Sequence, residues 1–208
     1  MASQPAPLFT PEEYLALERS ADTKSEYIDG LLVAMSGATR AHILINVNIS
    51  SALHGQLRGR PCEVYVQDMR VRIAEGRMYA YPDVTVVCGE PEFEDDEFDV
   101  LLNPTLIIEV VSDSTEGYDR GLKAARYRRR ASLQEYVLVA QDRVSVERYS
   151  RQGEQWVLTE ATGLDGVMDL PSIGCTLSLR DVYDKVTGSS KAELGHVSER
   201  PAPPGETR

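Results

Sequence analysis

Short, almost wholly apolar runs dominate the middle of the chain. Residues 84–88 form a β-branched run, and residues 105–111 form a second run that only Glu109 interrupts. Both runs are typical of central strands in a sheet. A helical pattern follows over about residues 119–131, and residues 136–140 form a third buried strand. The order strand, strand, helix, strand predicts an α/β sheet with a crossover helix.

Helix and hairpin signals precede these runs. Residues 10–13 (TPEE) have the form of a capping box with proline at the first helical position, and this helix should end near Arg19. The Asp-Gly pair at residues 29–30 lies between two apolar runs, which predicts a tight hairpin. Apolar residues at helical spacing predict an amphipathic helix over residues 42–57.

Alternating patterns predict further strands. Residues 62–66 and 71–73 indicate two strands or a hairpin, and residues 144–149 and 155–160 indicate an antiparallel hairpin. Residues 178–186 suit a short closing helix. The expected fold is a mixed α/β sheet flanked by helices, with an added N-terminal helix and hairpin.

Two carboxylates stand in segments that otherwise look buried. Asp83 directly precedes the first apolar run, and Glu109 lies within the second. Because side chains alternate along a strand, Glu109 shares a face with Ile107 and Val111. A buried carboxylate is costly unless a cation or hydrogen-bond donors meet it. Adjacent parallel strands could bring both carboxylates to one edge of the sheet. The pair, followed by Lys123 in the predicted helix, indicates a metal-assisted active site.

Each of these residues also has a simpler interpretation. Asp83 follows a proline and suits a turn residue that bonds its own backbone. Glu109 could pair with an arginine such as Arg126 at the end of its strand. Lys123 could belong to a solvated basic face, and Glu26 at the hairpin mouth could be a surface glutamate. The sequence leaves these alternatives open.

The residue types indicate which metal such a site would take. Two carboxylates and water are typical ligands of Mg²⁺ or Mn²⁺, whereas no Cys/His spacing in the chain indicates zinc. The three histidines, His42, His54 and His196, are too scattered to predict a metal cluster. They are expected to be structural or surface residues.

Charge is distributed unevenly along the 208 residues. The net charge is −11, with 33 acidic against 22 basic side chains, and this weakens the case for nucleic-acid binding, which needs a positive surface. Residues 91–100 are strongly acidic, whereas residues 120–130 contain six basic side chains and no acid. A local basic face is therefore compatible with the sequence.

The cysteines and the N-terminus indicate the cellular compartment in which the protein is expected. Cys62, Cys88 and Cys175 are widely spaced and lie in apolar runs, which suits reduced, buried thiols. The N-terminus lacks signal-peptide regions, and no apolar run approaches the ~20 residues of a membrane span. We expect a cytoplasmic protein without membrane contact. One domain is expected over residues 1–187, followed by a flexible tail over residues 188–208.

Several linked motifs resemble one known family. The chain is similar over about residues 8–186 to the Uma-type putative restriction endonucleases, a branch of the PD-(D/E)XK nuclease superfamily, in YPDVTVV, PTLIIEVVS, DRGLK, YRR and EYVLVA. The resemblance implies a restriction-endonuclease-like core. It also implies that Asp83 and Glu109 are catalytic metal ligands.

One residue departs from the superfamily pattern. The usual lysine, two residues after the acid, would fall on Val111. The resemblance implies that this lysine has moved to the helix, as Lys123. Glu26, in the motif SEYIDG, would be an auxiliary catalytic acid. Tyr127 and Arg126 could contact phosphate, but a tyrosine on a helix is more often a packing residue.

The implied activity is hydrolysis of DNA by a Mg²⁺- or Mn²⁺-dependent endonuclease. The metal would lower the pKa of the attacking water, and Lys123 would orient that water or offset transition-state charge. A homodimer is expected, because two related sites cut two strands most simply.

Two other functions remain open at this stage. A nuclease-fold nucleic-acid-binding or interaction module with weak or no catalysis suits the acidic charge and Val111. A metal-dependent hydrolase of small phosphate esters would explain the acidity, although no phosphate-binding glycine loop supports it.

Overall fold

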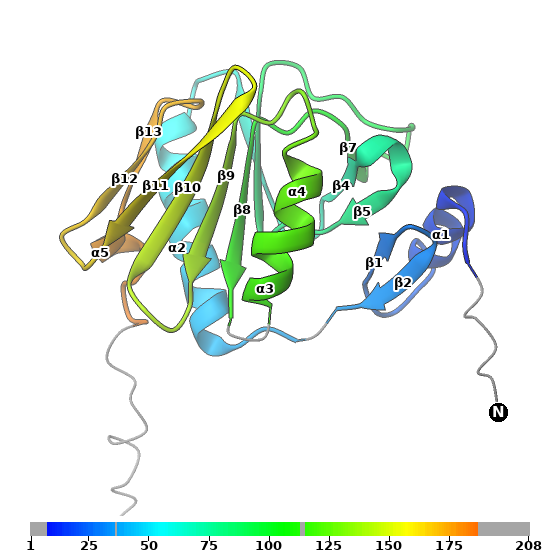
Figure 1. Cartoon of the computed structure of the whole chain (residues 1–208), viewed down its shortest axis with the longest axis horizontal. Coiled ribbons are helices and arrows are strands. Elements are labelled where there is room, and N and C mark those ends of the chain that lie inside the picture. Colours follow the sequence, from blue (N-terminus) through cyan, green and yellow to red (C-terminus); the bar gives the residue numbers. More distant parts are fainter. Residues whose placement is uncertain (1–7, 36, 113–114, 187–208) are drawn as a thin grey trace, which may run out of the picture.

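The computed structural model describes residues 8–35, 37–112 and 115–186. Its largest layer is a six-stranded sheet in the order β11-β10-β9-β8-β6-β3 (Figure 1). A five-stranded sheet in the order β2-β1-β5-β4-β7 lies to one side, and β12 pairs with β13. The predicted mixed α/β class is confirmed.

The elements have the following bounds. The six-stranded sheet contains β3 (Cys62–Val66), β6 (Val84–Cys88), β8 (Leu106–Val111), β9 (Glu135–Ala140), β10 (Ser145–Gln152) and β11 (Gln155–Thr162). The other strands are β1 (Ser25–Ile28), β2 (Leu31–Ala34), β4 (Arg70–Ile73), β5 (Met78–Ala80), β7 (Val100–Leu101), β12 (Val167–Leu170) and β13 (Cys175–Ser178). The helices are α1 (Pro11–Glu18), α2 (Arg40–Leu57), α3 (Glu116–Tyr118), α4 (Ala124–Tyr127) and α5 (Leu179–Val182). A 3₁₀ turn covers Ala74–Gly76, and a π-helical turn covers Asp119–Lys123.

The N-terminal elements form as their local signals predict. Thr10 accepts a hydrogen bond from the backbone N–H of Glu13, and the Glu13 carboxylate accepts one from the Thr10 N–H at 2.8 Å. The β1–β2 turn places Asp29 at φ 47° and Gly30 at φ 91°, the left-handed conformations that a two-residue hairpin turn requires. Helix α2 confirms the predicted amphipathic helix, beginning at Arg40.

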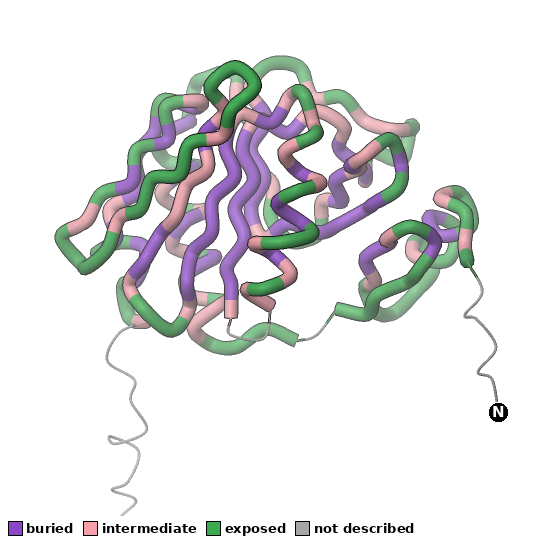
Figure 2. Tube along the Cα trace, in the orientation of Figure 1, coloured by how far each residue is buried: buried purple, intermediate pink, exposed green. Residues whose placement is uncertain are grey.

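Strand β8 is buried on both faces, and its side chains alternate as predicted. Leu106, Ile108 and Val110 belong to the core beneath α2. Ile107 and Val111 belong to a second core, which lies between this sheet, α4 and the five-stranded sheet. Figure 2 shows the continuous buried centre that β8 and its neighbours form. This double coverage explains why the strand is almost wholly apolar.

The pairing of the central strands corrects one expectation. Parallel neighbours were expected to bring Asp83 and Glu109 together, but β6 pairs with β8 antiparallel, with Val84 opposite Ile108. The parallel pair is β8 and β9, which the predicted crossover helix joins. The connection over residues 89–105, which includes β7, is long enough for the chain to turn back, so that β8 runs beside β6 in the opposite direction.

The crossover itself is less regular than the pattern predicts. Instead of one helix over residues 119–131, it consists of α3, the π-helical turn and α4, and it ends at Tyr127. A π turn places side chains differently from an α-helix and is frequent at functional sites. Here it carries both Asp119 and Lys123 inward, where both are buried.

The remaining strands divide between sheets in a way that alternation alone does not reveal. The strands predicted at residues 62–66 and 71–73 form, but β3 joins the six-stranded sheet and β4 joins the five-stranded one, so they are not a hairpin. The sequence interpretation missed the short strands β5, β7, β12 and β13. It also extended the closing helix too far, because α5 ends at Val182.

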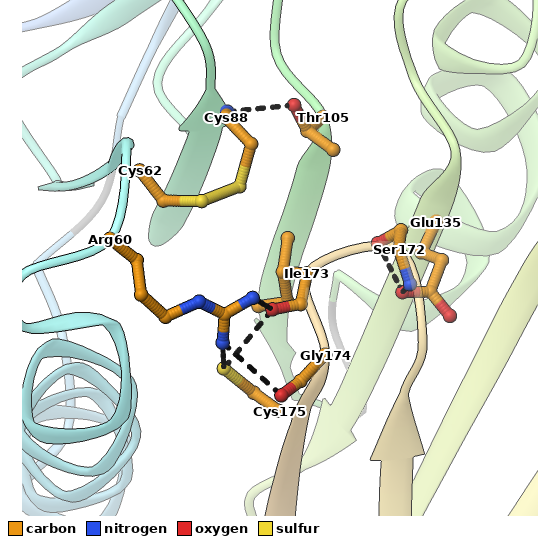
Figure 3. The surroundings of a disulfide bond; sticks show 9 residues. All are labelled: Arg60, Cys62, Cys88, Thr105, Glu135, Ser172, Ile173, Gly174 and Cys175. Carbon is orange, nitrogen blue, oxygen red and sulfur yellow. Dashed lines mark hydrogen bonds between the residues drawn. A yellow bond between two sulfur atoms is a disulfide. The ribbon is translucent and has the colours of Figure 1, made fainter.

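Two of the three cysteines contradict the expectation of reduced thiols. Cys62 and Cys88 lie opposite each other on β3 and β6 and form a disulfide (Figure 3). Only Cys175 is a free, buried thiol as predicted, and Arg60 lies beside it. The argument from cysteines for a reducing compartment therefore no longer holds.

Two expectations concern the chain as a whole. Within the described residues, none of the helices is long and apolar enough to cross a membrane. The tail predicted over residues 188–208 lies outside the described residues, and the prediction of one domain over residues 1–187 stays a prediction.

Candidate active site

One buried lysine lies among three carboxylates. Lys123 Nζ is 2.8 Å from Glu26 Oε1, 3.2 Å from Glu109 Oε1 and 3.5 Å from Asp119 Oδ1. We call these four residues the Lys123 cluster. Each of the four side chains is at most 8% exposed. A buried ammonium needs such partners, because an unpaired charge in the interior is very costly.

Three separate elements supply the Lys123 cluster. Glu26 comes from β1 of the five-stranded sheet, Glu109 from β8, and Asp119 and Lys123 from the π-helical turn. Tyr127 on α4 donates a hydrogen bond to Glu109 Oε1 at 3.0 Å, and Tyr118 on α3 donates one to Glu26 Oε2 at 3.1 Å. The Lys123 cluster thus connects the five-stranded sheet to the six-stranded sheet.

The Lys123 cluster has more negative than positive charge. Burial raises the pKa of Glu109 to about 8, and the carboxylates of Asp119, Asp83 and Glu26 add to the rise, while Lys123 opposes it. Burial disfavours the charge on Lys123, but Glu109, Glu26 and Asp119 outweigh it and raise the pKa of Lys123 above its ordinary value. Lys123 is therefore a cation at neutral pH, and a further positive charge would be stabilised beside it.

Asp83 is held by a different set of partners at the end of the β6–β8 pairing. Its Oδ1 accepts a hydrogen bond from Asn46 Nδ2 at 2.8 Å and lies 2.7 Å from His42 Nε2. Its Oδ2 accepts from the backbone N–H of Val110 at 2.7 Å. We call Asp83, His42 and Asn46 the Asp83 cluster. The bond to Val110 places the Asp83 carboxylate beside the residue that follows Glu109.

The structure resolves the alternatives that the sequence left open. Glu26 is not a surface glutamate, and Lys123 does not lie on a solvated face. Arg126 pairs with Asp29 rather than with Glu109. Lys123 contacts both Glu26 and Glu109, and Asp83 accepts from the backbone N–H of Val110 rather than from its own neighbouring backbone. Their catalytic roles stay predictions.

Sequence reasoning missed the contacts of five residues in this region, Asp119, Tyr118, Tyr127, His42 and Asn46. Asp119, within the DRGLK motif, lies four residues before Lys123, and this spacing could have indicated a pair. Tyr127 packs in the core as expected, and its hydroxyl also donates a hydrogen bond to Glu109. His42 was expected to be structural or at the surface. His42 and Asn46 share one face of the predicted helix, but nothing in their spacing points to Asp83.

The chain is similar to proteins of known sequence over most of its length. It is 41% identical over 157 residues to the uncharacterized protein sll1609 of Synechocystis sp., covering 75% of this chain and 89% of that protein. It is 34% identical over 182 residues to the uncharacterized protein slr1290 of the same organism, covering 87% and 94%. The Uma2 family model, described as a putative restriction endonuclease, matches residues 11–180. The chain belongs to the Uma2 family.

A solved structure supports the fold of this Uma2 protein. The crystal structure of a putative nuclease belonging to DUF820 from Anabaena variabilis superposes with a TM-score of 0.66 at 19% identity. The match covers 86% of this chain and 99% of that one. The predicted family and the restriction-endonuclease-like fold are confirmed.

The donor set of the Uma2 site suits a hard divalent cation. Among the described residues, no three His, Cys, Asp or Glu side chains form a group that could hold a metal by themselves. Mg²⁺, however, usually takes one or two carboxylates and completes its shell with water and phosphate oxygens. Asp83 Oδ2 accepts a single hydrogen bond, which leaves a lone pair for a cation. Asp83 and Glu109 therefore fit Mg²⁺ or Mn²⁺.

Proposed function

We propose that this Uma2 protein is a metal-dependent endonuclease that hydrolyses phosphodiester bonds of DNA. The observation that carries the proposal is the Lys123 cluster beside Asp83: a buried lysine, a carboxylate with a raised pKa and a second carboxylate with a free lone pair. Purely structural ion pairs need neither the excess of acid nor the open position on Asp83.

Asp83 and Glu109 would hold Mg²⁺ or Mn²⁺. When bound, such an ion polarises a phosphodiester and lowers the pKa of the attacking water. The hydroxyl of Tyr127 and the N–H of Val110 orient the two carboxylates. These contacts fix the ligands before the cation arrives, which reduces the cost of assembling the site.

Lys123 supplies the fixed positive charge of the site. Glu26 and Asp119 hold its ammonium within reach of Glu109, so Nζ can donate a hydrogen bond to a phosphate oxygen or to the attacking water. In this role Glu26 and Asp119 are positioning residues. The lysine performs from the helical segment the task that Val111 cannot perform from the strand.

Most arginines of the basic segment at residues 120–130 bond other groups of the protein. Arg120 pairs with Glu116 and Glu147, Arg126 pairs with Asp29, and Arg130 donates to the Leu102 carbonyl. Together with the net charge of −11, this favours a second candidate function, the hydrolysis of small phosphate esters at the same site.

Cleavage assays with supercoiled plasmid test the proposal. We expect nicking or linearisation with Mg²⁺ or Mn²⁺, and loss of cleavage with a chelator, with Asp83→Asn or with Glu109→Gln. Lys123→Met should also lose cleavage. Lys24→Met is its matched control, because Lys24 forms an exposed ion pair with Asp68 rather than buried contacts with the acids of the Lys123 cluster. Hydrolysis of p-nitrophenyl phosphate without plasmid cleavage would favour the second function instead.

We also propose that the active form is a homodimer acting on cytoplasmic DNA. Two related sites allow both strands of a duplex to be cut in one encounter. Analytical ultracentrifugation should show a dimer at the concentrations at which plasmid is linearised, and a monomer that linearises plasmid contradicts this assembly.

A further inference from the structure

Asn46 occupies a position that packing alone does not explain. It lies on the buried face of α2 between Ile45 and Ile49 and is 4% exposed. Its Nδ2 donates to Asp83, but its Oδ1 is buried and has no hydrogen-bond partner among the described residues. A buried acceptor without a donor destabilises the fold, because it loses the hydrogen bond that water would give it. The other buried side chains of α2 are all apolar, and they carry no such cost.

The amide orientation of Asn46 is fixed by its neighbour. If the amide were turned over, Oδ1 would face the Asp83 carboxylate, and two acceptors would repel each other. The Asp83 contact therefore determines that Nδ2 points at Asp83 and that Oδ1 is the atom left over. Because both atoms belong to one amide group, the unpartnered acceptor lies beside the proposed metal ligand.

His42 supports the same carboxylate oxygen from one helical turn away. His42 and Asn46 are four residues apart, so both project from one side of α2. Together they occupy both lone pairs of Asp83 Oδ1, while Val110 occupies one lone pair of Oδ2. A single lone pair of Asp83 is left for a cation, and its direction is set by the three contacts.

We propose that His42 and Asn46 are positioning residues of the metal site, and that Asn46 Oδ1 accepts a hydrogen bond from a water molecule of the hydrated cation. Mg²⁺ and Mn²⁺ keep several waters when carboxylates bind them, and these waters are donors. A water donor would satisfy the buried acceptor. The inference rests on the proposed function, because it assumes that Asp83 binds a divalent cation.

Calorimetric titration with Mn²⁺ tests this inference on the full chain without DNA. Asn46→Leu removes both polar atoms and keeps a side chain of similar size. We expect it to raise the Kd for Mn²⁺ about 10- to 100-fold, the usual effect of removing a group that orients a metal ligand. His42→Leu should weaken binding in the same way, and His42→Gln, which keeps an N–H donor, should recover part of the affinity.

Asn48→Leu is the matched control on the same helix. Asn48 donates to the carbonyls of Val182 and Asp184 at 3.0 and 3.1 Å, so its loss removes polar contacts of α2 without touching Asp83. We expect Asn48→Leu to change thermal stability but to keep the wild-type Kd. If Asn46→Leu does not fold, as circular dichroism would show, Asn46→Ala replaces it.

The outcomes separate the inference from the function on which it rests. A wild-type Kd in the folded Asn46 variants overturns the inference and leaves the proposed nuclease intact. A wild-type protein that binds no Mn²⁺ overturns both. A raised Kd for Asn46→Leu with an unchanged Kd for Asn48→Leu supports the positioning role.

Discussion

The Lys123 cluster and the Asp83 cluster hold their carboxylates in opposite ways. The first lies on the α4 side of β8, where three carboxylates share one ammonium and the four side chains are 5–8% exposed. The second lies against α2, where three contacts meet one carboxylate that is 14% exposed. In the Lys123 cluster, the lysine compensates carboxylate charge inside the protein. In the Asp83 cluster, the hydrogen bonds orient a carboxylate that can bind a cation from solvent.

Both clusters belong to the proposed active site, but they should contribute differently to the stability of the fold. Removing the lysine leaves buried acids without a counter-ion, so the Lys123 cluster should dominate folding. Changing Asp83 removes a charge that the fold does not need. The two clusters should therefore respond differently to substitutions that remove one charge each.

The largest effect should come from Lys123→Met, which keeps the length of the side chain. We expect the free energy of unfolding to fall by about 3–5 kcal/mol, because Glu26, Glu109 and Asp119 lose their shared cation. Urea denaturation at neutral pH with a chelator measures it. Lys24→Met, in an exposed ion pair with Asp68, should cost less than about 1 kcal/mol. Equal losses in the two variants contradict a special role of the Lys123 cluster in stability.

Local signals made the outer parts of this fold predictable. The capping box at Thr10 and the turn at Asp29 and Gly30 depend on residues within three positions of each other, and both form as the sequence indicates. Glu109 was recognisable because a single acid in an apolar strand breaks a strong pattern. Such signals need no knowledge of the tertiary structure.

Contacts between distant residues explain what the sequence could not give. The Asp83 cluster joins residues 37 and 41 positions apart, and the Cys62–Cys88 disulfide depends on the register of β3 with β6. No periodicity encodes such pairs. The π-helical turn that carries Lys123 inward also has no composition signal that distinguishes it from an ordinary helix.

Glu109 gives the next largest effect, as a dependence of stability on pH. Its pKa is 4.5 as an ordinary glutamate and about 8 in the folded protein, so unfolding between these values releases a proton. The stability that Glu109 contributes is fully present below about pH 4.5 and is lost as the pH rises through about 8. The free energy of unfolding should fall by up to about 1.4 kcal/mol per pH unit in this window.

Glu109→Gln should remove this slope, because glutamine does not titrate. Urea denaturation from about pH 5 to about pH 8 with a chelator compares the variant with the wild type. The variant should be relatively more stable at the alkaline end of this range, where the wild type holds a buried anion. The same slope in both proteins means that Glu109 keeps an ordinary pKa, and that the Lys123 cluster does not carry an excess of acid.

Asp83→Asn should have the smallest effect on folding and a large one on metal binding. Asparagine keeps one oxygen for Asn46 and His42, but its amide replaces the acceptor of the Val110 N–H, which costs about 1 kcal/mol. Losing the Asp83 charge offsets this, since that charge helps to raise the pKa of Glu109. We expect the free energy of unfolding to change by less than about 1 kcal/mol, while calorimetry shows the loss of Mn²⁺ binding. A destabilisation as large as that of Lys123→Met contradicts the distinction between the clusters, because Asp83 would then serve the fold rather than an incoming cation.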